Sequence, residues 1–175
     1  MQNIIELERW SKDIIDSASR FMKKQSKYEN RPVFCNFISK NGKLYATDNA
    51  ALAIVKNIGI EDQIEDMMLY SYLKQKNSLL LEMNVTEIPP MLDTIIDSME
   101  YISPDEFECD QFIVSQIINT LRDKGIYGHY GQSHFEKAPK KIKFNLMSQK
   151  GIIKNPIIAL TSHQLDIVVC PAQIN

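Results

Sequence analysis

Two stretches of the chain carry apolar residues at the three- and four-residue spacing of an amphipathic helix. The first runs from about Asn3 to Tyr28, and the second from about Gln111 to Lys124. This spacing places apolar side chains on one helical face and charged ones on the other. Pro32 ends the first stretch, because proline cannot continue a helix. Asp110 is a suitable N-cap for the second, and Gly125 marks its end.

Short apolar runs bounded by turn residues predict strands after each helix. An Asn-Gly pair at 41–42 is typical of a hairpin turn, and the other connections are too short for parallel crossovers. The pattern therefore predicts an α+β fold, with two helices packed on an antiparallel sheet and the order helix-then-strands occurring twice. The predicted strands are Val33–Ser39, Leu44–Thr47, Ala51–Lys56, Ser78–Val85, Glu106–Cys109, Lys141–Met147, Pro156–Leu160 and Asp166–Cys170.

The segment from about Gly59 to Ser103 has a less regular pattern. Asp62 to Tyr72 fits a short helix or a strand, and Met91 to Met99 has apolar residues at helical spacing. A chain of 175 residues is the size of one domain or at most two small ones. We therefore predict a single domain over residues 1–175, with an atypical insertion at about 59–103.

Composition indicates a globular protein, with 44% hydrophobic and 24% charged residues. The net charge is −2, so only a local cluster of Lys and Arg could bind nucleic acid. Cys35, Cys109 and Cys170 form no CxxC pair, and the three histidines lack ligand-like spacing, which argues against a metal site. The sequence has no signal-peptide pattern and no apolar run of membrane-spanning length. We expect a cytoplasmic protein with reduced cysteines and no membrane partner.

The usual catalytic signatures are absent from the sequence, including GxSxG, GxxxxGK[ST], GxGxxG and HExxH. Glu61-Asp62 and Glu65-Asp66 are neighbouring carboxylates in a polar setting, typical of a solvated surface. Cys109 has no recognisable partner base. We therefore predict a protein that is not an enzyme and needs no cofactor, with an α+β enzyme of unrecognised site as a remaining alternative.

Four segments together resemble one domain of the bacterial sliding clamp, the β subunit of DNA polymerase III. Clamp domains follow their first helix with Arg-Pro and a strand, as at Arg31–Phe34. A signature of the form ATDGHRLA is matched by Ala46–Ala53, and a strand-then-helix by Phe107–Leu121. A terminal strand of the form YVVMPMRL is matched by Ile167–Ile174.

The resemblance has clear departures. The His-Arg of the signature is Ala50-Ala51 here, and the Met and Arg of the ending are Cys170 and Gln173. The bacterial clamp subunit has three such domains, whereas this chain has room for one. A closed ring would therefore require several copies, which makes a homo-oligomer an expectation of the resemblance.

The resemblance implies that helix-borne cations bind the backbone of duplex DNA without sequence preference, through salt-sensitive contacts. The alternative is an ordinary solvated helix face, since Asp13, Asp16 and Asp123 dilute the positive potential. The candidate DNA-binding residues are Arg20, Lys23, Lys24, Lys27, Arg31, Arg122 and Lys124.

The resemblance also implies an apolar pocket that accepts short hydrophobic motifs of replication proteins. The signature turn and the C-terminal strand would form it, and in the three-domain clamp these segments come from neighbouring domains. Whether a neighbouring copy is needed here stays open, as does the alternative that Leu52 and Val168 are plain core residues. The candidate peptide-binding residues are Thr47, Leu52, Val168, Cys170 and Pro171.

The sequence therefore favours a non-catalytic, sliding-clamp-like processivity factor in DNA replication. The alternative is a clamp-like interaction module, an adaptor or decoy for replication proteins that does not encircle DNA. Either function requires both helices on one side of the sheet, and we expect the last strand at the sheet's rim.

Overall fold

The structure is a computed structural model that describes residues 3–24, 31–88, 92, 94–108 and 113–173. The described residues form a ten-stranded sheet in which every paired strand is antiparallel. In chain order the strands are β1 (Ile4–Glu6), β2 (Phe37–Lys40), β3 (Lys43–Thr47), β4 (Ala51–Val55), β5 (Met68–Leu73), β6 (Ser78–Asn84), β7 (Met99–Glu108), β8 (Lys143–Gln149), β9 (Ile158–Thr161) and β10 (Leu165–Val169).

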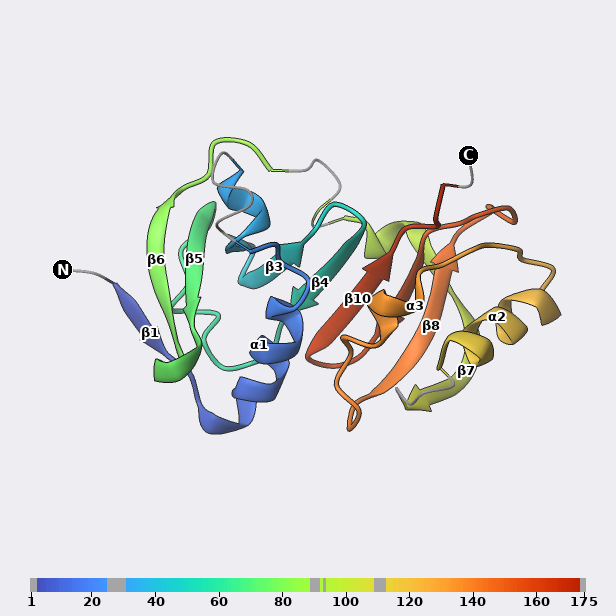
Figure 1. Cartoon of the computed structure of the whole chain (residues 1–175), viewed down its shortest axis with the longest axis horizontal. Helices are drawn as coiled ribbons and strands as arrows, with labels where there is room; N and C mark the ends of the chain where they lie inside the picture. Colours follow the sequence, from blue (N-terminus) through green and yellow to red (C-terminus); the bar gives the residue numbers. More distant parts are fainter. Residues whose placement is uncertain (1–2, 25–30, 89–91, 93, 109–112, 174–175) are drawn as a thin grey trace.

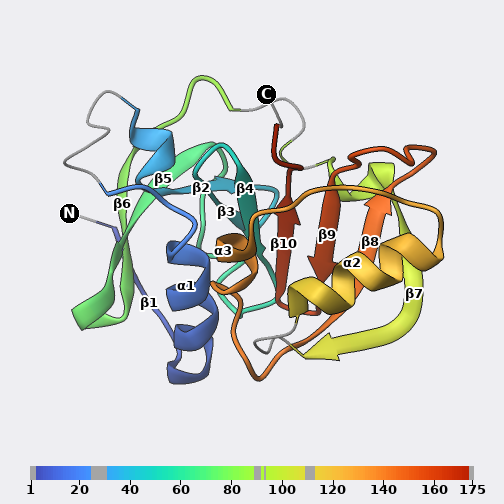
Figure 2. The ribbon, with the colours of Figure 1, turned by 45° about the vertical axis from the view of Figure 1, so that its right-hand side comes forward.

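The described α-helices are short and lie on one side of this sheet (Figures 1 and 2). None of them is long and apolar enough to cross a membrane. The α-helices are α1 (Lys12–Ser19), α2 (Ile113–Asp123) and α3 (Gln132–Phe135), and the 3-10 turns are η1 (Arg9–Ser11), η3 (Pro32–Phe34), η4 (Lys74–Lys76) and η5 (Ile96–Ser98).

The strand order across the sheet is β1-β6-β5-β2-β3-β4-β10-β9-β8-β7. The two halves of the chain meet where β4 pairs with β10, with Leu52 opposite Val168. The last strand therefore lies in the middle of the sheet, and our expectation that it forms the rim was wrong. Strands β1 and β7 form the two edges, at opposite ends of the molecule (Figure 1).

The two faces of the sheet have separate hydrophobic cores. Helices α1 and α2 bury Ile15 and Ile117 in the larger core, together with alternate sheet residues such as Ala53 and Ile167. The intervening residues of the same strands face the opposite side, where Ile54 and Val168 belong to the smaller core. This alternation follows from the two-residue period of a strand and gives the sheet a helix-covered face and an opposite face.

The repeated order helix-then-strands is visible around the β4–β10 pair. Helix α1 precedes β2, β3 and β4, and helix α2 precedes β8, β9 and β10. The symmetry is broken by the β5–β6 hairpin, which lies between β1 and β2, whereas β7 pairs directly with β8. Part of the predicted insertion at 59–103 is thus an integral hairpin of the sheet.

The prediction of one helix over Asn3–Tyr28 was wrong at both ends. Ile4–Glu6 is an edge strand, in which Ile5 pairs with Leu79, and the α-helix covers only Lys12–Ser19. The apolar residues before Lys12 match helical spacing by coincidence, because Ile5 is buried as part of the strand, whereas Ile4 and Trp10 are exposed. Residues 25–30 lie outside the described part.

Other strand predictions need smaller corrections. The run Val33–Ser39 divides into a 3-10 turn and the strand Phe37–Lys40. The ambiguous segment Asp62–Tyr72 ends in a strand, and the predicted short strand at Glu106–Cys109 belongs to the longer β7. Only Ile96–Ser98 is helical among the described residues of the Met91–Met99 segment.

Candidate peptide-binding pocket

The turn between β3 and β4 is fixed by its own polar side chains. Asp48 Oδ1 accepts hydrogen bonds from the backbone amides of Ala50 and Ala51, each at 2.9 Å. Thr47 Oγ1 donates to the carbonyl of Ala51 at 2.7 Å and accepts from the amide of Asn49 at 3.1 Å. Asn49 has a φ of 78°, a left-handed conformation that asparagine tolerates better than most residues. The turn is therefore preorganised.

Asp48 also connects this turn to the helix-covered face. Its Oδ2 lies 3.6 Å from Lys137 Nζ, which lies 5.1 Å from the ring centroid of Phe21. Burial acts to raise the pKa of Asp48, but the amide hydrogen bonds, Lys137 and His134 outweigh it and leave this pKa below its ordinary value. Asp48 is thus an anion at neutral pH whose charge is compensated locally.

The C-terminal strand lies directly beside the turn. Val168 pairs with Leu52, and the amide of Cys170 donates to the carbonyl of Ala50 at 3.1 Å. Thr47, Leu52 and Val168 occupy alternate strand positions that face away from the helices. The sequence thereby brings two segments more than a hundred residues apart to one place on the opposite face.

A pocket of about 300 Å³ opens at this place, and its lining is mostly apolar. Small side chains at Ala50 and Ala51 leave room beside the turn, and aliphatic groups form the walls. The lining residues are Val33, Phe34, Thr47, Asn49, Ala50, Ala51, Leu52, Leu92, Ile95, Ile157, Val168 and Cys170.

Four of the five candidate peptide-binding residues line this pocket, namely Thr47, Leu52, Val168 and Cys170. Pro171 follows Cys170 and is half-buried, but it is not part of the lining. Leu52 is half-buried and Val168 is buried, so both also contribute to the smaller core. All lining residues belong to one chain, and a neighbouring copy is not needed to form the hollow.

The pocket offers an uncharged environment. Cys170 is exposed at its mouth, where partial burial of the thiol and the negative charge of Asp48 both raise the pKa of Cys170. The thiol is therefore protonated at neutral pH. A hollow of this kind can bury aliphatic or aromatic side chains of a ligand.

Sequence reasoning missed the wall opposite the two strands. Val33 and Phe34 come from the 3-10 turn before β2, Leu92 and Ile95 from the segment before β7, and Ile157 immediately precedes β9. The local patterns predicted strands at Val33–Ser39 and Pro156–Leu160 and helical spacing at Met91–Met99, but only the folded chain brings these segments together. The Arg31–Phe34 match to clamp domains was the one signal that pointed to this wall.

Two candidate DNA-binding residues lie beside this pocket. Lys23 Nζ lies 5.4 Å from the ring centroid of Phe34, and Arg31 Cζ lies 6.0 Å from it. The backbone amide of Lys23 donates to the Phe34 carbonyl at 2.6 Å, which holds the chain after α1 against η3. Both cations thus flank an aromatic side chain of the pocket wall.

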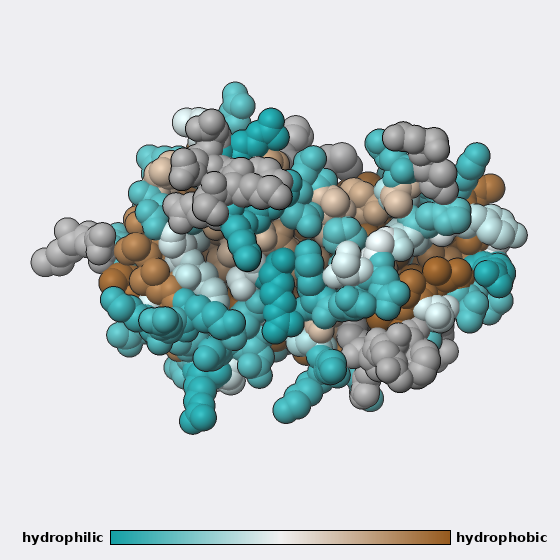
Figure 3. Space-filling view, in the orientation of Figure 1, coloured by the Kyte–Doolittle hydropathy of each residue, from teal (hydrophilic) through white to brown (hydrophobic). Residues whose placement is uncertain are grey.

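Most other candidate DNA-binding residues are exposed near the ends of the two helices. Arg20 follows α1, Arg122 lies in the last turn of α2, and Lys24 and Lys124 are also exposed. Lys27 lies outside the described residues. Hydrophilic residues cover the middle of this face over α1 (Figure 3).

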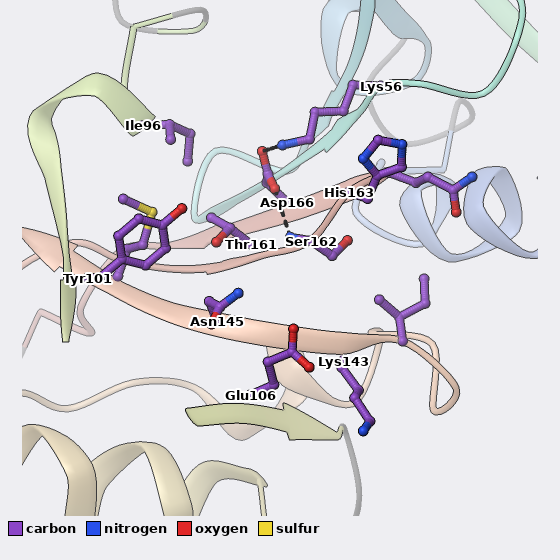
Figure 4. A pocket seen from close by; sticks show the side chains of 13 residues that line it. Lys56, Ile96, Tyr101, Glu106, Lys143, Asn145, Thr161, Ser162, His163 and Asp166 are labelled. Atoms are coloured by element: carbon purple, nitrogen blue, oxygen red, sulfur yellow. Dashed lines mark hydrogen bonds and ion pairs between the residues drawn. The ribbon is translucent and has the colours of Figure 1, made fainter. Parts of the chain in front are cut away.

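A second, polar hollow of about 380 Å³ lies on the opposite face (Figure 4). Its buried carboxylate, Asp166, accepts from Lys56 Nζ at 2.6 Å and from the amide of Ser162 at 3.1 Å. Both carboxylate oxygens therefore have partners. Among the described residues, no group of three His, Cys, Asp or Glu is arranged to hold a metal ion.

A solved structure of the Helicobacter pylori beta clamp bound to a DNA ligase peptide is similar to this chain. The TM-score is 0.50 at 9% sequence identity, and the match covers 99% of this chain and 66% of the clamp chain. The chain thus spans just under two thirds of that clamp. No protein-family model and no curated protein match the sequence. The fold is therefore clamp-like, and the antiparallel sheet predicted from sequence is confirmed.

Proposed function

We propose that this protein is a sliding-clamp-like, non-catalytic interaction protein that binds short apolar segments of partner proteins. The observation that carries the proposal is the apolar pocket formed by the β3–β4 turn and the C-terminal end of β10. The clamp-like fold supports it, since the structurally similar Helicobacter pylori clamp is described with a bound DNA ligase peptide. The partners we propose are replication proteins with apolar clamp-binding peptides.

The physical basis is burial of apolar side chains in a preformed hollow. The Asp48 and Thr47 hydrogen bonds fix one wall, so little conformational entropy is lost when a ligand binds. Leu52 and Val168 form the floor from neighbouring strands. A peptide with adjacent leucine and phenylalanine side chains provides suitable apolar area for this hollow.

Truncation of the pocket floor tests the proposal. We expect Leu52→Ala to weaken binding of a capped peptide with a Leu-Phe pair about tenfold, because apolar contact area is lost. Fluorescence anisotropy of the labelled peptide measures the effect. Leu81→Ala is the matched control, since Leu81 is also half-buried but packs against the core on the helix-covered side. Equal losses in both variants, or no binding by the unmodified protein, would contradict the proposal.

A second candidate function is processive DNA replication through backbone contacts on the helix-covered face. Exposed cations at the ends of α1 and α2 favour it, namely Arg20, Lys24, Arg122 and Lys124. Acidic neighbours such as Asp13 and Asp123 are also exposed on this face and reduce the positive potential. The expected binding is weak and strongly salt-dependent.

Removal of two cations tests the DNA-binding proposal. We expect the variant with both Arg122→Gln and Lys124→Gln to bind duplex DNA more weakly. The slope of log binding constant against log salt concentration should become shallower by about 0.9 per lost phosphate contact. Lys150→Gln with Lys154→Gln is the control, because both lysines are exposed between β8 and β9. If this slope is unchanged in the variant that lacks Arg122 and Lys124, α2 is not part of the DNA-binding surface.

A separate experiment tests encirclement. Retention of the protein on nicked circular duplex DNA, but not on linear duplex DNA, would indicate that it encircles the DNA.

A further inference from the structure

The peptide-binding pocket has a counterpart at the other end of the β4–β10 pair. Ala53 pairs with Ile167 at the centre of these two strands. A local two-fold axis through this pair exchanges the β3–β4 hairpin with the β9–β10 hairpin, because Ala46 pairs with Ala53 in the first and Leu160 pairs with Ile167 in the second. The same number of residues separates the paired positions in both hairpins, so the two turns have the same length.

The backbone repeats the same contact at both ends of the strand pair. At the pocket, the Cys170 amide donates to the carbonyl of Ala50 at 3.1 Å, and at the other end the Lys56 amide donates to the carbonyl of Gln164 at 3.0 Å. The polar hollow of about 380 Å³ opens beside the second contact, as the apolar pocket of about 300 Å³ opens beside the first. The fold thus builds one backbone frame twice, once for each hollow.

The two hollows differ in the side chains that this frame presents. By the strand register, Asp166 occupies the position equivalent to Leu52, and Lys56 occupies the position equivalent to Cys170. Lys56 Nζ lies 2.6 Å from Asp166 Oδ2, so a salt bridge forms the floor of the polar hollow (Figure 4). The walls of this hollow include apolar groups, namely Ile96, Ile142 and Met147. The floor is therefore charged in one hollow and apolar in the other.

We infer that the Lys56–Asp166 pair restricts the binding of apolar peptides to one of these two hollows. This inference rests on the proposed peptide-binding function and names the residues that determine where on the chain it occurs. An apolar anchor in the polar hollow would remove water from the Lys56 ammonium group, whose side chain is 25% exposed, without offering it a hydrogen-bond acceptor. This desolvation opposes the gain from apolar burial, as unmatched polar groups do at other specific interfaces.

Replacement of the ion pair by apolar side chains tests the inference. We expect the variant with both Lys56→Met and Asp166→Leu to bind the capped Leu-Phe peptide at two sites per chain, whereas the unmodified protein binds it at one. The variant should fold, because exchange of a buried ion pair for apolar groups of similar volume is often neutral or stabilising. Calorimetric titration measures the stoichiometry, and circular dichroism checks the fold.

Further variants locate the new site. Added to the apolar variant, Ile96→Ala should weaken the second site, because Ile96 lines the polar hollow, and Leu52→Ala should weaken the first. The charge-matched control is Lys150→Met with Glu136→Leu, which removes one cation and one anion from exposed positions and should keep one site per chain.

A smaller apolar pair guards against steric failure of the first variant. If Lys56→Met with Asp166→Leu overpacks the floor and the protein does not fold, Lys56→Ala with Asp166→Val takes its place and should give the same stoichiometry. The smaller side chains leave the hollow open and still remove both charged groups.

The outcomes separate this inference from the function on which it rests. Two peptide sites on the unmodified protein, or a folded apolar variant that still binds one peptide, would overturn the inference and leave the pocket proposal standing. A second site that Ile96→Ala does not weaken would also overturn it, because the new site would then lie elsewhere. If neither the unmodified protein nor the apolar variant binds the peptide, the proposed function fails and the inference fails with it.

Discussion

Asp166 is a buried carboxylate whose stability depends on one lysine. Its side chain is 3% exposed, and Lys56, its partner at 2.6 Å, is 25% exposed. Burial raises the pKa of Asp166 above its ordinary value, although Lys56, the Ser162 amide and Lys43 oppose this shift. The native state therefore binds the proton more tightly than the unfolded state. As pH rises from the ordinary carboxyl pKa through the raised one, stability falls.

We expect Lys56→Met to make this pH dependence stronger. The variant leaves Asp166 buried without its cation and should lose about 2 kcal/mol of unfolding free energy at neutral pH, less than the ~3–5 kcal/mol typical of fully buried pairs because Lys56 is partly exposed. The loss should be smaller at acidic pH, because Asp166 in the variant takes up a proton there and no buried charge remains. Urea denaturation at both pH values measures it.

The control for this prediction is Lys150→Met, which removes an exposed lysine. It should change stability by less than about 0.5 kcal/mol at either pH. A Lys56→Met loss of the same size at both pH values would show that lost packing, and not the buried charge, causes the effect.

The site could be predicted from sequence only where local patterns determine it. Thr47 and Leu52 lie in strands on either side of a turn whose Asp and Asn residues are recognisable, and Val168 lies in a strand that ends before a proline. Phe34, Leu92 and Ile95 come from irregular segments, and tertiary packing alone places them in the pocket wall. Their contribution depends on contacts that no local spacing records.

At the scale of elements, α1 is held by the β5–β6 hairpin as well as by the sheet beneath it. The Tyr72 hydroxyl on β5 donates to Asp16 Oδ1 on α1 at 2.5 Å. Lys74 Nζ, in the adjoining 3-10 turn, lies 4.0 Å from the same oxygen. Burial and the Asp16 carboxylate together raise the pKa of Tyr72, so the hydroxyl keeps its proton as donor. The hairpin inserted into the sheet therefore supports the first helix.

We expect Tyr72→Phe to reduce the free energy of unfolding by about 1 to 2 kcal/mol, because a hydrogen bond to a carboxylate is lost. A double-mutant cycle with Asp16→Ala should give a coupling energy of similar size. Chemical denaturation of the four proteins measures both values.

Tyr101→Phe is the control for the Tyr72 variant, since Tyr101 is 67% exposed. It should leave stability within about 0.5 kcal/mol of the unmodified protein. Zero coupling between Tyr72 and Asp16 would mean that the hairpin and α1 are stabilised independently.

The two helices differ in how well sequence predicted them. Helix α2 covers Ile113–Asp123, within the predicted Gln111–Lys124, because its apolar spacing and its glycine end are local features. The first helix was predicted too long, since burial of Ile5 depends on pairing with Leu79 far along the chain. Likewise, the position of β5 and β6 between β1 and β2 is a non-local pairing that spacing alone cannot indicate.

At the scale of the whole molecule, the two faces of the sheet separate the two proposed activities. The helix-covered face carries the exposed cations proposed for DNA, whereas the peptide pocket lies on the opposite face at the β4–β10 pair. The sheet edges, β1 and β7, are distant in strand order from that pair and are the strands available for pairing between copies. Self-association through these edges would therefore leave the pocket accessible.

This arrangement predicts that peptide affinity does not depend on the oligomeric state. Leu52 and Val168 belong to one chain and pair directly, so each chain should bind one peptide with the same affinity whether alone or assembled. Anisotropy of the labelled Leu-Phe peptide across a protein dilution series, with light scattering on the same samples, measures affinity and molar mass together. DNA retention by encirclement should instead disappear as the molar mass falls to that of one chain. A peptide affinity that falls with the molar mass would show that a second chain completes the pocket.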